Sequence, residues 1–505
     1  MYAIGIDSGT QGTKVLVVDI DTGNIIGRGH SPHAMVPGLK PGENEQDPAA
    51  WIRAFEEALE EALKDAGIDA TRIVSLGVSG QQHGFVPLDK EGRPIRPAKL
   101  WNDTSTIEET EAIVERLGGP KKYIEKLGIS LAVGYTASKI LWMKKKEPKN
   151  YKNLATVLLP HNYLNFCITG IPHMEYGDAS GTGLMDIRRR EWQAEAVEAI
   201  DAGLRAKLPG LRHPRDPVGV MKESIASKFG LKKILVSSGG GDNMMAAIGT
   251  GNVASGACTL SLGTSGTIYG FFDKPFSDPQ GEIAAFCDST GGWLPLLCTM
   301  NATGPTEFMK DLFKLDNAAL EILAAQAPAG SAGLLFLPFV DGERVPALPE
   351  ASGTFFGLNR RNFDPSHMAR SVMEGTILNL GYGFGRMRKL GLNPTAIRAT
   401  GGGAKNRLWL QIVADILKTP VATLHENEAA AFGAAIQSIW TYWRDKGQEI
   451  KIKDLTDQMV KTETSGLEPN PRNFAIYDAL QERFNSLWKT LKEEFKAHKK
   501  LLAKL

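Results

Sequence analysis

The sequence predicts an α/β protein built from two duplicated domains with a cleft between them. Its first 80 residues alternate strand-like runs, turns and one helix in the order β-β-β-α-β, which is typical of a mixed sheet covered by helices. A Gly-Thr-x-Gly-Thr turn occurs at Gly9–Thr13 and again at Gly263–Thr267, 254 residues later and about half-way along the chain. Because turn, flanking strands and spacing all recur, duplication is favoured over a chance match of common hairpin residues.

The bulk composition is that of a folded enzyme-sized protein. The 505 residues suggest two or three domains, and 42% of them are hydrophobic and 23% charged. A net charge of +1 gives no reason to expect nucleic acid or a membrane as partner. The four cysteines are widely spaced, and the chain opens without a signal-peptide pattern. We therefore expect reduced thiols and a cytoplasmic protein.

The element pattern can be followed along the chain. Strands are expected at 2–6, 14–19, 25–28 and 73–78, and Asp47 followed by Pro48 marks the start of a helix. The lysine-rich tail from about residue 470 is expected to form a helix. The predicted domains are an N-terminal half at 1–245, a second half at 246–440, and a helical extension at 441–505 packed on the second half.

The Gly-Thr turns are candidates for phosphate binding. Glycine lets the backbone approach an anion closely, and successive N–H groups and threonine hydroxyls can donate to it. Asp7, at the end of the first strand, would then hold a Mg²⁺ ion beside the phosphates, although an aspartate at this position can also simply bond to the turn. The spacing of a P-loop and a dinucleotide-binding fingerprint are both absent at the first strand.

Two further glycine runs follow strand-like segments. Ser238–Asn243 precedes an apolar helix, so Asp242 is placed where it could accept the proton of an attacking hydroxyl or could cap the helix. Gly401–Asn406 offers bare backbone on which adenine could lie, which by itself is a weak signal.

Side chains that suit a polyol follow two other strand-like runs. Gln82 and His83 stand in the segment Ser79–Gly84, and Trp101, Asn102 and Asp103 follow Leu100. The polar groups can hydrogen-bond sugar hydroxyls, while an indole offers an apolar wall. A single histidine is more often structural, so the cluster counts for more than His83 alone.

Together these residues resemble the FGGY family of carbohydrate kinases, in the actin/Hsp70/sugar-kinase superfamily. The segment Gly353–Glu374 matches one family signature in full, and the region near Tyr135–Trp142 resembles another, with Lys146 departing from it. The resemblance implies two actin-like (ribonuclease H-like) ATPase domains, ATP and Mg²⁺ as cofactors, and Asp242 as general base.

The resemblance also completes the set of expected site residues. Asp242 is the expected catalytic residue and Asp7 the expected metal ligand. The expected substrate-binding residues are Gln82, His83, Trp101, Asn102, Asp103, Asp242 and Asn243. The expected nucleotide-binding residues are Gly9, Thr10, Gln11, Thr13, Lys14, Gly263, Thr264, Ser265, Gly304, Gly402, Gly403 and Asn406.

Within the family, the segments around Gln82, Asn102, Asp178 and Asp242 imply phosphorylation of D-xylulose in pentose catabolism. Gln82 replaces a methionine found in some relatives, so ribulose, a hexulose, gluconate or glycerol stay open as substrates. An actin- or Hsp70-like ATP-driven binding protein without a sugar substrate is the alternative from another class. The expected partners are a small sugar and ATP, with a homodimer among the oligomeric states considered.

Overall fold

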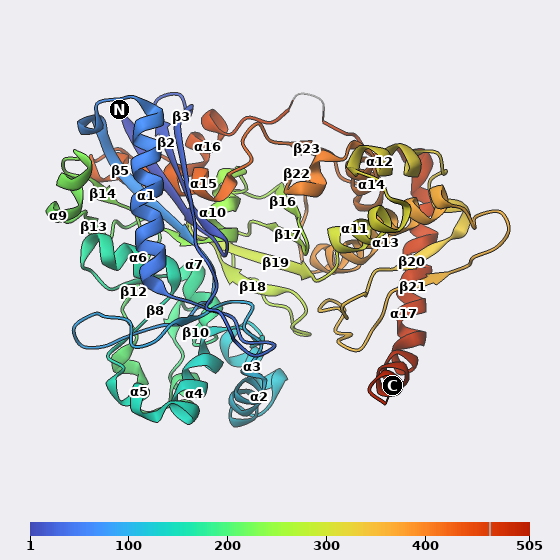
Figure 1. The fold of residues 1–505 in the computed structure, drawn as a ribbon, viewed down its shortest axis with the longest axis horizontal. Helices are drawn as coiled ribbons and strands as arrows, with labels where there is room; N and C mark the ends of the chain where they lie inside the picture. Colours follow the sequence, from blue (N-terminus) through green and yellow to red (C-terminus); the bar gives the residue numbers. More distant parts are fainter. Residues whose placement is uncertain (464–465, 505) are drawn as a thin grey trace. The chain divides into compact units, whose positions relative to one another are not determined.

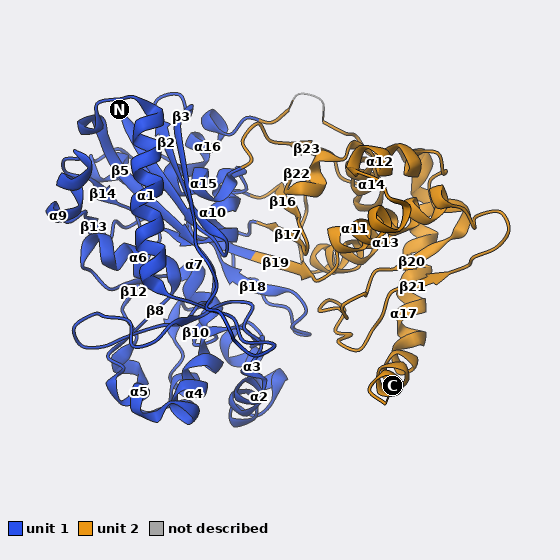
Figure 2. Cartoon of the chain, in the orientation of Figure 1, with its two compact units in different colours: residues 1–254, 271–294, 428–461 blue, residues 255–270, 295–427, 462–505 orange. Residues whose placement is uncertain are grey.

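The computed structural model describes residues 1–463 and 466–504 and confirms a mixed α/β protein with two large sheets (Figure 1). Figure 2 shows its two compact units, and both are discontinuous in sequence. Unit 1 contains Met1–Ala254, Phe271–Leu294 and Glu428–Lys461, and unit 2 contains Ser255–Gly270, Pro295–Asn427 and Thr462–Leu505. The expected division into three consecutive segments stays a prediction. Within the described residues, no helix has the length and apolarity needed to cross a membrane.

The sheet of unit 1 is mixed. Its strand order is β13-β14-β5-β1-β2-β3, with β15 also paired to β5. β1 runs antiparallel to β2 and parallel to β5. A tight turn therefore joins β1 to β2, whereas the chain reaches β5 through a crossover connection. The strands are β1 (Tyr2–Ser8), β2 (Gly12–Asp19), β3 (Ile25–Pro32), β5 (Ile73–Gly80), β13 (Gly219–Val220), β14 (Leu235–Val236) and β15 (Gly240–Gly241).

Helices cover both faces of this sheet. Successive residues of a strand point to opposite sides, so neighbouring residues of β1 pack against different helices. Ile4 and Ile6 of β1 pack with Trp51 and Phe55 of α1, whereas Ala3 packs with residues of α10 and α15. The unit-1 helices are α1 (Pro48–Ala66), α2 (Ile107–Arg116), α3 (Pro120–Leu127), α4 (Thr136–Lys146), α5 (Pro148–Asn153), α6 (Pro160–Thr169), α7 (Tyr176–Ala179), α8 (Ala194–Glu198), α9 (Glu223–Ala226), α10 (Asp242–Gly249), α15 (Ala429–Asp445) and α16 (Ile452–Met459).

The predicted start of α1 is confirmed. Asp47 caps the helix by accepting a hydrogen bond from the Ala49 N–H at 3.0 Å, and Pro48 occupies the first helical position. Gly67 ends the helix in the left-handed conformation, which glycine adopts without steric cost. Short strand pairs complete unit 1: β4 (Glu45–Gln46) with β7 (Ala98–Lys99), β6 (Val86–Leu88) with β8 (Thr156–Leu158), β9 (Met174–Glu175) with β12 (Leu211–Arg212), and β10 (Met185–Asp186) with β11 (Glu191–Trp192).

The second sheet repeats the arrangement of the first around its central strand. β16 runs antiparallel to β17 and parallel to β22, as β1 does to β2 and β5. The strand order is β18-β19-β17-β16-β22-β23. The strands are β16 (Ala257–Leu262), β17 (Gly266–Gly270), β18 (Ala284–Cys287), β19 (Trp293–Thr299), β22 (Ala396–Thr400) and β23 (Val421–Thr423). The predicted duplication is therefore visible in the topology.

Unit 2 has its own helical core. Leu378 of α13 packs with Tyr477, Phe484 and Trp488 of α17, which confirms the predicted C-terminal helix. The remaining unit-2 elements are α11 (Thr303–Phe313), α12 (Asn317–Ala325), β20 (Leu335–Leu337), β21 (Thr354–Phe356), α13 (Pro365–Lys389), α14 (Arg407–Leu417) and α17 (Phe474–Leu502).

The helix α15 packs on the first sheet and on α10 with almost no side chain between the backbones. A Cβ atom added to Gly5 of β1 would overlap the carbonyl oxygen of Ala431, and one added to Gly77 of β5 would overlap that of Ala434. A Cβ on Gly433 of α15 itself would overlap the Met245 carbonyl oxygen of α10. Glycine is thus required at these positions by close backbone approach.

This packing can be tested with a substitution for which helix propensity and packing have opposite effects on stability. Alanine favours a helix interior over glycine by about 1 kcal/mol, so helix propensity alone predicts that Gly433→Ala stabilises the protein. We expect instead that overpacking against α10 lowers the free energy of unfolding by about 1–3 kcal/mol. Gly385→Ala in α13 is the matched control, because a Cβ there meets no atom within contact distance. Urea unfolding of the full chain would contradict the packing argument if Gly433→Ala unfolded at a higher urea concentration than the native protein.

Candidate active site

The carboxyl ends of β1 and β5 bring the first predicted site residues together. Asp7 lies opposite Ser79 in the parallel pairing of these strands, and the Ser79 hydroxyl donates to Asp7 Oδ1 at 2.8 Å. β15 pairs with the last residues of β5, and α10 begins directly after it at Asp242. The fold therefore places two carboxylates, from residues far apart in sequence, at the same edge of the sheet.

The Asp242 carboxylate is buried, and the charge of Asp7 further destabilises its ionised form. Burial raises the pKa of Asp242 to about 7, and the negative charge of Asp7 contributes to the same shift. Burial also raises the pKa of Asp7, against the opposing effects of Ser79 and Lys14. A carboxyl group with a pKa near neutrality exchanges a proton readily at physiological pH, which is the property of a general base.

Asn243 fixes the orientation of Asp242. Its backbone N–H donates to Asp242 Oδ1 at 2.8 Å and its side-chain amide to the same oxygen at 3.1 Å. The amide of Asn243 also donates to Gln82 Oε1 at 2.6 Å, and Gln82 Nε2 contacts the sulfur of Met244 at 3.0 Å. Because both donors use Oδ1, the other oxygen, Oδ2, is the one left to accept a proton.

His83 is held in an unusual backbone conformation beside a buried acid. Its φ of 58° lies in the left-handed region, and its N–H donates to Asp178 Oδ1 at 3.3 Å. The ring packs between Tyr135 and Phe286, with centroid distances of 4.6 and 5.3 Å. Burial alone would raise the pKa of Asp178, but hydrogen bonds from His161 and His83 lower it to about 2. The carboxylate is thus ionised and anchors the loop.

A chain of hydrogen bonds connects the first Gly-Thr turn to Trp101. The indole N–H donates to the Thr10 hydroxyl at 3.1 Å, and that hydroxyl donates to Gln81 Oε1 at 3.1 Å. Gln81 in turn donates to Gln46 Oε1 at 2.9 Å. The indole remains 41% exposed, so its face is available to a ligand.

Asn102 and Asp103 differ in their availability. The Asn102 side-chain oxygen is buried and meets no hydrogen-bond donor among the described residues. Both oxygens of Asp103 are already filled: Oδ1 accepts from the backbone and hydroxyl of Ser105, and Oδ2 accepts from the Asn44 N–H and from Lys99. The Asn102 oxygen is therefore free for a ligand hydroxyl, whereas the Asp103 carboxylate is occupied.

The rest of the first turn forms a tight hairpin. The Gly9 N–H donates to the Gly12 carbonyl at 3.0 Å, and the hydroxyl of Thr13 lies 3.1 Å from that of Ser8. The Gln11 carbonyl accepts from the backbone of His33 at 3.2 Å. Lys14 forms an ion pair with Glu428 at 2.6 Å, which joins the second strand to the residue preceding α15.

The predicted nucleotide-binding segments of unit 2 are neighbours. β16 and β22 are parallel, so the Gly263–Ser265 turn and the Gly401–Asn406 run follow adjacent strand ends. A Cβ on Gly403 would press against Leu262, the residue before the turn. The Thr303 N–H donates to the Gly263 carbonyl at 3.0 Å, which brings the α11 residue Gly304 to the same turn. Asn406 caps α14 by accepting from the Trp409 N–H.

The predicted residues thus fall into two groups. In unit 1, Gln82, Asp242 and Asn243 are linked by hydrogen bonds, as are Thr10 and Trp101. In unit 2, the Gly263 turn, Gly304 and the Gly402–Asn406 segment adjoin one another. Three buried residues that contact predicted ones, Gln46, Gln81 and Lys139, are missing from the predicted set; the ammonium group of Lys139 donates to the His83 carbonyl oxygen at 2.8 Å. Gln81 could have been found beside Gln82, but Gln46 and Lys139 carry no local signal.

Comparison with known proteins agrees with this geometry. Residues 2–249 match the N-terminal domain of the FGGY family of carbohydrate kinases, and residues 259–442 match its C-terminal domain. The chain is 42% identical to the xylulose kinase of Haemophilus influenzae over 492 residues, which cover 96% of this chain and 98% of that protein.

Solved structures show the same similarity. A ligand-bound xylulose kinase from Lactobacillus acidophilus superposes with a TM-score of 0.90 at 25% identity, over 98% of this chain and 99% of that one. A gluconate kinase from the same organism gives a TM-score of 0.89 at 25% identity, with the same coverage. The chain therefore belongs to the FGGY family of carbohydrate kinases and uses ATP to phosphorylate its carbohydrate substrate.

Proposed function

We propose that this protein phosphorylates D-xylulose at its terminal primary hydroxyl, giving D-xylulose 5-phosphate and ADP. Asp242 carries the proposal, because its carboxyl group combines a pKa near 7 with a fixed orientation and one oxygen without a donor among the described residues. The similarity to xylulose kinases supports the choice of sugar. The cytoplasmic location and a homodimeric state stay predictions.

The chemical step requires a base at the sugar hydroxyl. Asp242 Oδ2 takes the proton of the terminal hydroxyl while the hydroxyl oxygen forms a bond to the γ-phosphorus of ATP. The bond between that phosphorus and the bridging oxygen breaks, and ADP leaves with the electron pair. Asn243 keeps Oδ1 occupied by two donors, so the base presents one defined oxygen to the substrate.

Sugar recognition is assigned to unit 1. The buried Asn102 oxygen can accept a hydrogen bond from a sugar hydroxyl, which would remove the cost of leaving it unpaired. The exposed face of Trp101 supplies an apolar wall, and Gln82 and His83 stand at the end of β5 near Asp242. For Asp103 we propose a different role from the predicted sugar contact. Its filled carboxylate positions the loop that carries Trp101 and Asn102.

Asp7 fits a Mg²⁺ ligand. Its carboxylate is partly buried, has Ser79 as a hydrogen-bond donor, and repels Asp242. A divalent cation next to Asp7 would relieve this repulsion, and Mg²⁺ typically takes one or two protein carboxylates together with phosphate oxygens and water. When bound, the ion would neutralise charge on the transferring phosphoryl group. Backbone N–H groups of both Gly-Thr turns, and the bare backbone at Gly402–Gly403, are proposed to hold the nucleotide.

Replacing Asp242 by asparagine separates chemistry from folding. We expect kcat to fall by about 10²–10⁴-fold, the usual scale for loss of a general base, with the KM for ATP little changed. The thermal unfolding midpoint should stay level or rise, because the substitution removes a buried carboxylate that Asp7 repels. Near-normal turnover in this variant would refute the assignment of the base.

The acid limb of the pH profile should report Asp242. Its raised pKa means that the group is protonated and inactive below about pH 7 and becomes a base as pH rises. We expect log kcat/KM for the sugar to fall with a slope of one below that pH. Asn243→Ala removes the side-chain hydrogen bond that lowers this pKa and keeps the backbone one, so its limb should move to higher pH. A limb at the same pH in both proteins would point to another titrating group.

A substrate panel tests the choice of sugar. In an ADP-release assay, kcat/KM should be highest for D-xylulose and at least about tenfold lower for D-ribulose, gluconate and glycerol, the scale of a lost hydroxyl contact. Asn102→Ala should raise the KM for D-xylulose more than it lowers kcat, because the proposed contact serves binding. A preference for gluconate would instead match the similarity to the gluconate kinase.

A further inference from the structure

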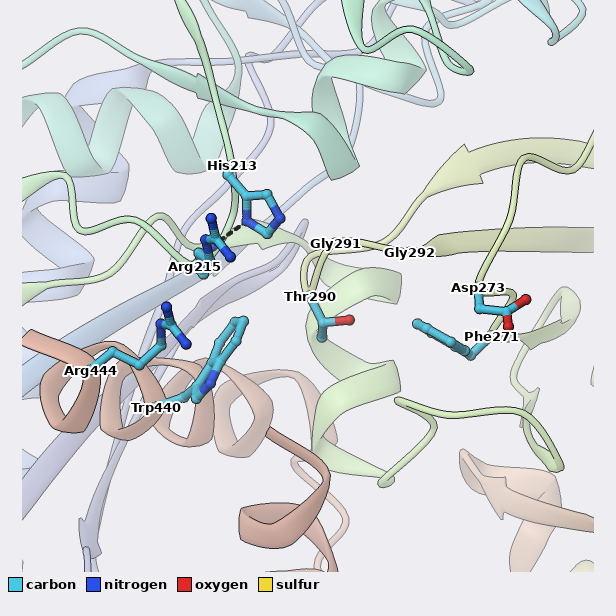
Figure 3. A pocket seen from close by; sticks show the side chains of 9 residues that line it. All are labelled: His213, Arg215, Phe271, Asp273, Thr290, Gly291, Gly292, Trp440 and Arg444. Atoms are coloured by element: carbon cyan, nitrogen blue, oxygen red, sulfur yellow. Dashed lines mark hydrogen bonds between the residues drawn. The ribbon is translucent and has the colours of Figure 1, made fainter. Parts of the chain in front are cut away.

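Unit 1 contains a pocket of about 310 Å³ that is separate from the candidate active site. Figure 3 shows its lining, in which His213, Arg215, Arg444 and Trp440 gather on one side and Asp273 lies beside Phe271 on the other. None of the predicted catalytic, sugar-binding or nucleotide-binding residues lines it. The pocket is therefore distinct from the residues expected to serve the kinase reaction.

The basic side of the pocket concentrates positive charge. Burial and then the charge of Arg215 lower the pKa of His213 to about 4, against the opposing charge of Asp216 and with smaller contributions from Arg190 and Arg444. All three guanidinium groups thus act on one imidazole. The imidazole is neutral at physiological pH, and its Nδ1 accepts a hydrogen bond from the backbone N–H of Arg215 at 3.2 Å. Its Nε2 then carries the proton and can donate.

The arginines are weakly neutralised by the protein. Asp216 lies 3.8 Å from Arg215, whose side chain is 49% exposed, so this pair contributes little. Arg444 forms no ion pair with any residue in the described ranges, and its guanidinium lies 5.9 Å from the centre of the Trp440 ring. Asp273 is the single acidic residue of the lining. Two arginines thus face the cavity without a full countercharge.

The floor of the pocket is a rigid glycine turn. Asp288 Oδ1 accepts from the N–H groups of Thr290 and Gly291 at 3.1 and 2.8 Å, and Arg190 donates to the carbonyl of Gly292 at 3.1 Å. A Cβ on Gly291 would press against the edge of the His213 ring. The turn therefore lies directly against the His213 ring.

We propose that this pocket binds a small phosphorylated sugar, with the phosphate against Arg215 and Arg444 and the sugar between Trp440 and Asp273. Guanidinium groups match the geometry of phosphate oxygens, and the Nε2 of His213 adds a neutral donor. The indole face suits the apolar side of a sugar, and the Asp273 carboxylate can accept from a hydroxyl. Inorganic phosphate alone would leave this second half of the pocket unfilled. The site does not depend on which sugar the enzyme phosphorylates.

Titration calorimetry with D-ribose 5-phosphate as the probe tests the proposal on the full-length protein. The native protein should bind one equivalent, and Arg215→Gln and Arg444→Gln should each weaken binding by about tenfold or more, as expected for a charged hydrogen bond. Arg53→Gln is the matched control, because Arg53 is an exposed arginine of α1 in the same unit with only a 3.8 Å ion pair. The two pocket variants should keep the native kcat for sugar phosphorylation.

The remaining outcomes overturn the proposal. Equal affinity of the two pocket variants and the native protein would place the probe elsewhere, such as at Asp242. Equal binding of D-ribose would show that the arginines do not select a phosphate, and equal binding of inorganic phosphate would remove the sugar from the ligand class. Absence of binding at millimolar concentrations of the probe would leave the pocket without this function.

Discussion

The close approach of α15 to β1, β5 and α10 is the constraint on which the rest of unit 1 depends. Glycines at Gly5, Gly77 and Gly433 remove the side chains that would otherwise separate these backbones. At such short range the helix cannot slide without carbonyl oxygens colliding with the sheet, and interiors packed this tightly have little free volume to absorb a shift. The strand that carries Asp7 and the helix that begins at Asp242 are therefore held against one common element.

This rigidity explains how the protein tolerates two mutually repelling carboxylates. Burial and the neighbouring charge of Asp7 disfavour the ionised form of Asp242, and a looser scaffold would let the two groups separate or admit water. On the Asp242 side, Gln437 of α15 anchors the loop that leads to Asp242. Its amide oxygen accepts from the Gly239 N–H at 2.9 Å and its amide nitrogen donates to the Gly239 carbonyl at 3.2 Å. Favourable packing elsewhere in unit 1 thus offsets the cost of a locally unfavourable site that is suited to proton transfer.

Local signals in the sequence predict the first strands, the first long helix and the C-terminal helix, but not how the elements assemble. The Asp47 cap, the alternating strands and the duplicated turns depend on near neighbours, and the structure confirms them. The place of α15 in unit 1 does not depend on near neighbours. Its partners Gly5 and Gly77 lie hundreds of residues away, and in the sequence they are visible only as isolated glycines. The occupied carboxylate of Asp103 was partly hidden, since one of its four donors, the Asn44 N–H, comes from a distant loop.

The same helix also connects the arginine-lined pocket with the candidate active site. Besides holding Gly239, the Gln437 side chain donates to the Ser289 carbonyl at 3.1 Å, and Thr290, the next residue, lines the pocket. Trp440 and Arg444 follow on α15 at one and two further helical turns. One helix therefore supports the loop before Asp242 and a wall of the pocket. Linkage between two binding sites is reciprocal. A ligand in the pocket that changes the affinity for the sugar at Asp242 must therefore have its own affinity changed by the sugar by the same factor.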